Sequence, residues 1–428
     1  MRRLRLLILI SAASLAVSGV AFGSGFSIFE QGSKASGMGG AFAATADDPT
    51  AIFYNVAGIA QQRHMEVNMG ATVINFSNEF RGDRNDPFTS GTTGHYARHT
   101  FVPPNAYAII PIGQNLTFGI GTFAAYGLRT DWEDPWVGRF VSRDANLKTV
   151  SVEPAVAWQT TDGRFAVGAG FEYRRSHITL NQNLALPFPN PFTGRIADIG
   201  NAYLNSDWEN GTGWNVGVLF KPGTWRFGAS YRAPMDIDYK GDATFTQIST
   251  GNAGLDALAK AGIPPSQTIS TSLPFPATTI VGVATSMIPN WDVEADITHT
   301  TWSRFKQLDI TFNSTPASNV HRPQNWEDTM SYRLGGNRKI GDDWQVRLGG
   351  VYDENPQPTE AVGPLLPDSD RVGIAFGVGY RRGPFSIDAN EMVLHFMERS
   401  TKGISNDHFN GTYKTDGTLL SVNFGYRF

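Results

Sequence analysis

The strongest constraint on the fold is a period-two alternation of apolar and polar residues that continues to the end of the chain. The last ten residues read LLSVNFGYRF, and their even positions are all apolar: Leu420, Val422, Phe424, Tyr426 and Phe428. In a β-strand such alternation gives one apolar and one polar face. In a soluble sandwich the apolar face would cover a core, whereas in a transmembrane barrel it would face lipid.

The same alternation recurs in segments throughout the chain: 65–73, 150–159, 165–174, 225–232, 293–297, 344–353 and 371–381. Charged residues fall on one parity of these segments, together with glycine and serine, and they include both signs. Opposite charges can pair across the polar lumen of a barrel. No apolar run after residue 25 is long enough for a transmembrane helix, so a membrane protein made from this chain must be a closed barrel.

The first 24 residues have the pattern of a secretory signal peptide. Arg2, Arg3 and Arg5 precede an apolar run that ends near Val17 and is followed by small residues. A spanning helix would need about 20 apolar residues, and this run is shorter. We expect cleavage between residues 21 and 25.

The connections between alternating segments are alternately short and long, which predicts an even number of strands. The predicted short turns are 111–115, 160–164, 221–225, 288–291, 340–344 and 381–385. The predicted long loops are 80–103, 127–146, 181–203, 242–274, 313–325, 354–370 and 398–412. Short turns are typical of the periplasmic side and long loops of the extracellular side. The sequence therefore predicts an all-β fold, a 14-stranded antiparallel transmembrane β-barrel over residues 63–428.

Aromatic residues next to the short turns predict a girdle at the periplasmic interface. They are Trp158, Phe165, Phe220, Trp225, Trp291, Trp344 and Phe385. The terminal Phe428 fits the same interface if the last strand closes the barrel against the first. An aromatic last residue also resembles the signal by which the barrel-assembly machinery recognises outer-membrane proteins.

Residues 25–62 precede the first strand, are rich in glycine and alanine, and show no sustained alternation. We call this segment the N-terminal hatch and expect it to plug the barrel lumen. A disordered periplasmic leader is the alternative interpretation.

Composition excludes several other classes of protein. The net charge of −4 gives no basic field for nucleic acid, and the absence of cysteine removes disulfides and thiolate metal sites. We expect no cofactor and no bound metal. Asp83, Asn85 and Asp86 form an acidic loop cluster for which a cation site and a solvated loop are both open interpretations. The chain has no nucleophile elbow and no HExxH motif, so we expect no enzyme, with an outer-membrane lipase as the enzymatic alternative.

Several motifs resemble those of the outer-membrane long-chain fatty acid transporters, the FadL-like family, which includes importers of aromatic hydrocarbons. In the hatch they are Gly25-Phe26, Glu30-Gln31, Gly37-Met38-Gly39, Ala46-Asp47-Asp48 and Asn55-Val56-Ala57-Gly58. In the barrel they include WRFGASYRAPMDIDYKGDATF (225–245), WDVEADITHTTWSRF (291–305) and PDSDR (367–371). One departure is Val56, where the family usually has proline.

The resemblance implies passive import of hydrophobic small molecules across the bacterial outer membrane, either long-chain fatty acids or neutral aromatic hydrocarbons. It implies capture between long loops, transfer to a site above the hatch, and exit by hatch movement or sideways through the wall. We expect contact with outer-membrane lipid and lipopolysaccharide, and a monomer. A general diffusion porin is a further alternative, against which the hatch argues.

Candidate anchors for an acid are Arg174, which points inward by parity, and its neighbours Arg175 and His177. The carboxylate anchor of the family falls within a few residues of them. Pairing of Arg174 with lumen carboxylates such as Glu172, Glu294 or Asp296 is the alternative. Lys306 is offset from the position where the family can supply a lysine, and Asp309 lies near that position.

Candidate apolar contacts come from the loops and the hatch. Leu255 and Leu258 have helical spacing in one loop and face a second loop carrying Phe188 and Phe192, although these residues could equally pack the loops together. Phe26 and Phe29 at the hatch tip are expected to reach the ligand.

Candidate gating residues lie in the hatch and on the third strand. They are Asn55, Val56 and Ala57 in the hatch, and Gly119 and Gly121 on the inward face of the strand. Glycine within a strand often marks a bulge or a close backbone approach. We therefore expect a kink near Gly119 and Gly121 that opens a lateral gap beside the hatch.

Overall fold

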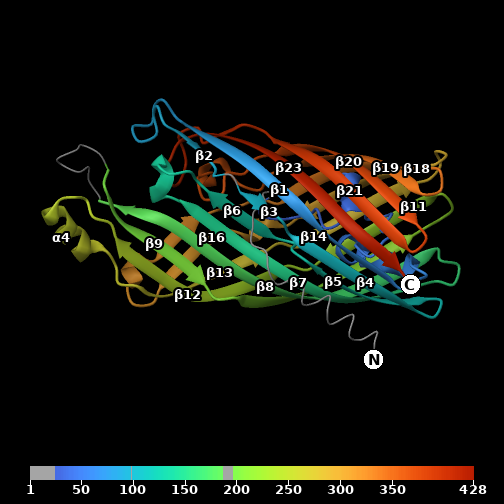
Figure 1. Cartoon of the computed structure of the whole chain (residues 1–428). Coiled ribbons are helices and arrows are strands. Elements are labelled where there is room, and N and C mark those ends of the chain that lie inside the picture. Colours follow the sequence, from blue (N-terminus) through green and yellow to red (C-terminus); the bar gives the residue numbers. More distant parts are fainter. Residues whose placement is uncertain (1–24, 98, 187–195) are drawn as a thin grey trace.

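The computed structural model describes residues 25–97, 99–186 and 196–428. The predicted signal peptide, and Phe188 and Phe192 of the predicted capture loop, lie outside the described residues. Figure 1 shows an elongated barrel of tilted strands with helix α4 at one end. Among the described helices, none combines the length and the apolar character required to cross a membrane.

The strands form fourteen spans, several of which are interrupted, so that the described chain contains more strands than spans. The strands are β1 (Glu66–Gly82), β2 (Thr93–His95), β3 (Thr100–Phe101), β4 (Pro104–Ile112), β5 (Leu116–Phe123), β6 (Gly127–Asp131), β7 (Asp144–Gln159), β8 (Phe165–Ala185), β9 (Asp198–Ser206), β10 (Glu209–Phe220), β11 (Trp225–Arg232), β12 (Met235–Gln247), β13 (Gln267–Phe275), β14 (Thr278–Thr285), β15 (Trp291–Thr300), β16 (Gln307–Phe312), β17 (Val320–Pro323), β18 (Thr329–Ile340), β19 (Trp344–Asp353), β20 (Arg371–Arg382), β21 (Phe385–Phe396), β22 (Arg399–Ser400) and β23 (Gly411–Arg427). The helices are α2 (Ser33–Gly37), α3 (Ala51–Tyr54), η1 (Val56–Gln61), η2 (Val137–Phe140), α4 (Ala253–Gly262), η3 (Trp302–Arg304), η4 (Pro316–Ser318) and η5 (Thr359–Ala361).

Pairing of the first strand with the last closes the barrel, as predicted. β1 and β23 are antiparallel over their full lengths, from Glu66 opposite Arg427 to Gly82 opposite Gly411. The terminal residue continues this contact, because Phe428 N donates to Met65 O at 2.9 Å. Ser421 on the inward face of β23 is fully buried, whereas more than half of the side chain of Leu420 is exposed. The alternation of the last ten residues therefore separates lumen from lipid.

The short turns lie where the sequence predicted them, but the strands reach further into the predicted long loops. β12 continues to Gln247 and β13 starts at Gln267, within the predicted loop 242–274. In β12 the pattern is inverted, because Ile237 and Tyr239 are buried inside while Asp238 is exposed outside. Beyond the membrane the outer face of a strand meets water instead of lipid. A strand can therefore continue there with polar residues on its outward face.

The hatch has its α2 helix against β19, β20, β21 and β23, and its η1 helix against β5, β7, β8 and β10. These strands belong to different sides of the barrel, so the hatch lies in the lumen (Figure 1). Close packing depends on glycine in the wall, since a Cβ at Gly349 would lie 2.1 Å from Gly39 N. This placement agrees with the predicted plug rather than with a free leader.

The Asn55 side chain fixes a turn in the hatch where the family usually has a proline at the next position. Its Oδ1 accepts from Ala57 N at 3.2 Å, and its Nδ2 donates to Ala43 O at 2.7 Å and to Val218 O at 3.0 Å. Val56 is the first residue of η1. The turn is thus held by the asparagine amide, and valine at position 56 does not remove it.

A lipid-facing substitution tests the register of the barrel. Ile374 on β20 is 69% exposed on the outward face, and Ile404, in the loop after β22, is 49% exposed. We expect Ile374→Arg to lower the free energy of unfolding from lipid vesicles by about 2–4 kcal/mol, because a charge at mid-bilayer loses its hydration. Ile404→Arg is the matched control and should change it by less than about 0.5 kcal/mol. Equal losses in the two variants would show that Ile374 does not face lipid.

Substitutions at the hatch turn test which residue fixes it. Asn55 has extended backbone angles (φ −156°, ψ 100°), which suit a residue before proline. Val56→Pro should raise the free energy of unfolding by about 0.4–1 kcal/mol, because proline at the first helical position loses no helical hydrogen bond. Asn55→Ala should lower it by at least about 1 kcal/mol, because the cap is lost. A Val56→Pro variant as destabilised as Asn55→Ala would contradict this assignment. Urea unfolding measures both.

Candidate functional site

An apolar cavity of about 820 Å³, which we call the inner cavity, extends from the hatch tip to the extracellular half of the barrel. Its apolar walls include Leu147, Ile178, Leu180, Leu204, Ile269, Leu273, Leu308 and Ile310. Its polar lining consists of Asn146, Asn205, Ser206, Thr271 and Gln324. Among the described residues that line it, none carries a charge. Such a lining suits a large apolar ligand held by few polar contacts.

A second cavity of about 760 Å³, the outer cavity, continues from the inner one toward the loops. The two share five lining residues: Leu180, Leu204, Leu308, Ile310 and Leu365. The outer cavity also contains the charged residues Asp144 and Arg322. The two cavities therefore adjoin along these five apolar side chains, and charged side chains line only the outer one among the described residues.

Arg322 on β17 presents a guanidinium group to the outer cavity. Its Nη2 donates to Gln182 Oε1 at 3.2 Å and to Val141 O at 3.5 Å. Within the described residues it forms no ion pair with a carboxylate. Nothing in the sequence singled out Arg322, because its role depends on loops that meet only in the fold.

Phe26 at the hatch tip lines the inner cavity and lies at the centre of an aromatic cluster, and its contact with a ligand stays a prediction. Its ring centroid is 4.6 Å from that of Trp302, 5.7 Å from Trp326, 5.8 Å from Phe275 and 6.0 Å from Tyr126. Rings at these separations attract one another beyond simple burial. The cluster closes the inner cavity toward the hatch.

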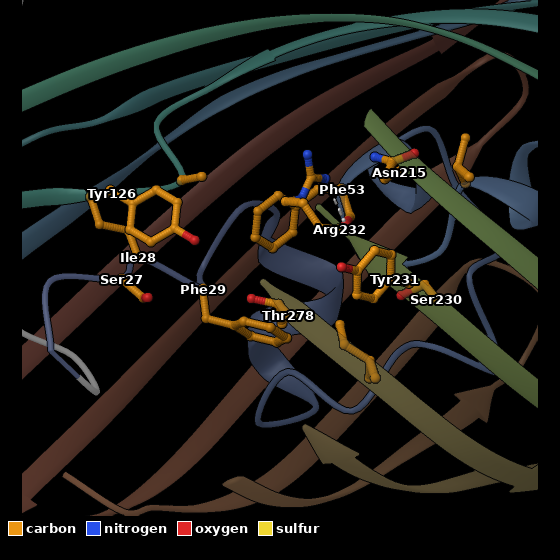
Figure 2. A pocket seen from close by; sticks show the side chains of 13 residues that line it. Ser27, Ile28, Phe29, Phe53, Tyr126, Asn215, Ser230, Tyr231, Arg232 and Thr278 are labelled. Carbon is orange, nitrogen blue, oxygen red and sulfur yellow. Dashed lines mark hydrogen bonds between the residues drawn. The ribbon is translucent and has the colours of Figure 1, made fainter. Parts of the chain in front are cut away.

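A third, more polar cavity of about 500 Å³, the lumen pocket, is lined by Tyr126 and by residues of the hatch and wall (Figure 2). Phe29 lines this pocket rather than the inner cavity, next to Phe53 and Arg232. Arg232 Nη1 pairs with Glu153 at 2.6 Å and with Glu172 at 2.5 Å. Phe26 and Tyr126 thus separate an apolar cavity from a pocket with a paired charge.

The predicted anchor Arg174 points into the barrel but is occupied by other contacts. It is 2% exposed, its Nη2 lies 2.6 Å from Glu172 Oε1, and its guanidinium carbon lies 4.5 Å from the Tyr126 ring centroid. It lines none of the three cavities described above. The alternative interpretation, in which Arg174 pairs with a lumen carboxylate, describes its environment.

The other predicted cations lie away from the cavities as well. Arg175 is on the outward face of β8, 5.5 Å from the ring centroid of Trp208, and His177 Nε2 contacts Asn205 Oδ1 at 3.1 Å. Lys306 lies in the exposed segment after η3 and lines none of the three cavities. Successive side chains of a strand point to opposite faces, so Arg175, directly after the inward Arg174, faces outward.

The helical spacing of Leu255 and Leu258 is confirmed as α4, whose residues line none of the three cavities described above. Leu255 and Ala259 pack with Leu186 and Ile199, whereas Leu258 is 51% exposed. Leu255 and Ala259 of α4 therefore pack the loops together, and the groove between α4 and the loop of Phe188 and Phe192 stays a prediction.

The predicted kink at Gly119 and Gly121 was also wrong. β5 pairs without interruption with β4 and with β7 across both residues. A Cβ at Gly119 would lie 3.0 Å from Ile52 Cδ1, and one at Gly121 would lie 3.1 Å from Ile52 Cγ2. The two glycines provide room for a hatch side chain instead of bending the strand.

The wall is interrupted a few residues further along, between the second and third spans. The last β4–β5 pair is Ala106 with Thr122, and contact resumes where Ala97 N donates to Asp131 O at 2.8 Å. Between these limits, no backbone hydrogen bond joins the described residues of the two spans. We call this region the wall opening.

The hatch supplies the hydrogen bonds that the second span does not. Ile28 N donates to Ala125 O at 2.8 Å, and Gly127 N donates to Phe26 O at 2.9 Å. Ser27 and Tyr126 thereby form an antiparallel bridge. Unsatisfied backbone groups are costly where lipid is near, so the hatch tip closes the opening chemically as well as sterically.

Two acidic residues of the loops, Asp86 and Asp368, accept hydrogen bonds from backbone N–H groups. Asp86 Oδ1 accepts from Phe88 N and Thr89 N, so this part of the acidic loop forms a turn, and no metal-binding group of residues occurs within the described ranges. Burial raises the pKa of Asp368 to about 7. Its Oδ2 accepts from Gly25 N at 2.8 Å, next to the hatch tip.

Comparison with solved structures shows the same fold. A FadL homologue from Pseudomonas aeruginosa superposes with a TM-score of 0.80 at 22% identity, covering 94% of this chain and 99% of that chain. The toluene transporter TodX from P. putida superposes with a TM-score of 0.74 at 17% identity, covering 92% of this chain and 97% of that chain.

Comparison of sequences identifies the family. A long-chain fatty acid transport protein from Salmonella typhi is 26% identical over 436 residues, which is 98% of each chain. A 47 kDa outer membrane protein from Pasteurella multocida is 26% identical over 441 residues, again 98% of each chain. The family model described as outer membrane protein transport protein (OMPP1/FadL/TodX) matches residues 14–428. The chain belongs to this family of outer-membrane transport proteins.

Proposed function

We propose that this outer-membrane transporter of hydrophobic substrates takes its substrate into the outer cavity, passes it to the inner cavity and releases it sideways through the wall opening. The observation that carries the proposal is the shared apolar lining of the two cavities. Members of this family are transporters, and passage along such a path needs no chemical step.

The inner cavity favours an apolar ligand or the apolar part of an amphiphile. Burial of a charge among uncharged side chains would cost several kcal/mol, whereas apolar surface gains about 25 cal/mol per Å². The hatch occupies the lumen below this cavity, which disfavours a general pore for polar solutes.

The outer cavity favours an acid whose carboxylate meets Arg322 while its chain enters the inner cavity. An arginine without a carboxylate partner can form a charge-assisted hydrogen bond with a ligand. The Salmonella relative is named as a long-chain fatty acid transport protein, in agreement with this class of substrate. A neutral aromatic hydrocarbon is the second candidate, favoured by the uncharged inner lining and by the TodX likeness in fold.

Sideways release is supported by the geometry of the hatch tip. Residues 26–28 pair with 125–127 at the opening, and Phe26 also closes the inner cavity. Displacement of the tip would therefore open the cavity and the wall together. A hydrophobic substrate would then enter lipid without crossing the polar lower lumen.

Substitution of Arg322 tests the position of an acidic head group. Arg322→Gln should raise the dissociation constant of a long-chain fatty acid about 10-fold or more, since a charge-assisted hydrogen bond is lost. The affinity for an alkylbenzene of similar length should stay unchanged. Arg338→Gln, which alters an exposed arginine outside the cavities, is the control. Isothermal titration in detergent measures all three. Equal acid affinity in the two variants would leave the neutral hydrocarbon as the better candidate.

A disulfide across the hatch bridge tests sideways release. Ser27 and Tyr126 form a non-hydrogen-bonded antiparallel pair, whose Cα atoms lie about 4.5 Å apart, within the range for a disulfide. The chain has no other cysteine. The oxidised Ser27→Cys/Tyr126→Cys variant should lose uptake of the labelled substrate in cells and regain it with reductant, whereas each single variant should not respond to reductant. Undiminished uptake by the oxidised double variant would exclude movement of the tip.

A further inference from the structure

Two acidic residues on the inward face of β15, Glu294 and Asp296, contact the middle of the hatch. Both are buried, at 1% and 2% exposure. We propose that they are positioning residues that hold residues 42–45 of the hatch against the wall, so that the tip moves relative to a fixed point. This proposal extends the account of transport and does not depend on which substrate is carried.

The evidence is a set of hydrogen bonds from four consecutive backbone N–H groups. Phe42 N and Ala43 N both donate to Asp296 Oδ2, at 2.8 and 2.9 Å. Ala44 N donates to Glu294 Oε1 at 2.6 Å, and Thr45 N donates to Glu294 Oε2 at 2.9 Å. The two side chains thus recognise the backbone of one short segment.

These carboxylates differ from three other buried acids on the barrel strands. Glu153, Glu172 and Asp353 each pair with arginine. Within the described residues, neither Glu294 nor Asp296 forms an ion pair. A buried carboxylate needs compensating partners, and here the hatch N–H groups are those partners. The hatch and the acidic pair therefore stabilise each other.

The segment is also confined by close packing. A Cβ at Gly228 on β11 would lie 2.0 Å from Ala43 O, so the wall and the hatch backbone touch there. Asn55 Nδ2 holds the same carbonyl oxygen at 2.7 Å. Residues 42–45 consequently meet the wall through hydrogen bonds to Glu294 and Asp296 and through close backbone packing at Gly228.

The tip of the hatch is held differently. Its backbone bonds to the wall opening run between neutral groups, and its main contact is the aromatic cluster around Phe26. By contrast, residues 42–45 make four backbone hydrogen bonds to Glu294 and Asp296, twice as many as residues 26–28 make to residues 125–127 of the wall. A ligand in the inner cavity therefore competes with the tip and leaves residues 42–45 in place.

The oxygen atoms used by the two acids differ, which gives a sharp test with isosteric variants. Glu294 accepts with both oxygens, so Glu294→Gln places an amide N–H₂ against a hatch N–H. Asp296 accepts both bonds with Oδ2, and its Oδ1 has no hydrogen-bond partner among the described residues. An asparagine oxygen can accept two bonds, so Asp296→Asn keeps both.

Hydrogen exchange, followed by mass spectrometry on the folded protein in detergent, measures how strongly the backbone N–H groups of residues 42–45 are protected by these hydrogen bonds. We expect exchange about 10-fold or more faster in Glu294→Gln and faster again in Glu294→Ala, because a hatch N–H that bonds to Glu294 loses its acceptor and is left buried without a partner. Asp296→Asn should exchange as slowly as the unmodified chain. Steady conductance in planar bilayers should rise in the two Glu294 variants only.

Two results would overturn the proposal. Unchanged exchange in folded Glu294→Gln would show that residues 42–45 are not held by this side chain. Equal acceleration in Glu294→Gln and Asp296→Asn would show that the loss of charge, rather than the recognition of backbone N–H groups, controls the hatch. Heat-modified mobility on gels reports folding of each variant, and the isosteric variants answer the question if Glu294→Ala does not fold.

Discussion

The requirement that every backbone group find a hydrogen bond in lipid governs this structure. The full-length pairing of β1 with β23 meets it for the two ends of the sheet. At the wall opening the backbone groups of the second and third spans do not bond to each other, and the tip of the hatch supplies hydrogen-bond partners there. The part of the hatch that closes the cavity is therefore also the part that completes the wall, and in the route that we propose its displacement opens both.

A change of polarity along each span creates the binding path. In the lipid-spanning part, the outward face is apolar and the inward face carries paired charges such as Glu172 and Arg174. Further out, β12 exposes Asp238 to water and buries Ile237 and Tyr239 inside. The inner cavity lies in this second region, where the barrel interior is apolar. The same strands thus serve as a membrane wall and as a hydrophobic container.

Sequence predicted the barrel because alternation is a local property. It could not predict that Phe26 and Phe29, both expected to reach the ligand, line two different cavities, because the partition between them forms only in the fold. The acid anchor was harder to predict, because the sequence does not decide whether Arg174 binds a ligand or pairs with a carboxylate. The fold shows that Glu172 reaches Arg174. Arg322 gave no signal, because Gln182 and the wall of the outer cavity come from distant loops. Gly119 and Gly121 of β5 were predicted to bend the strand, whereas in the fold they make room for Ile52 of the hatch.

The central claim is that substrate moves through one continuous apolar path, and Leu308 lies in the part of the wall shared by both cavities. The most direct test is the initial rate of uptake of a labelled hydrophobic substrate by cells that express the chain, compared with cells that express a folded Leu308→Lys variant. A charge in the shared wall should reduce uptake to the level of cells without the protein. Uptake by the variant at the rate of the unmodified chain would contradict the account.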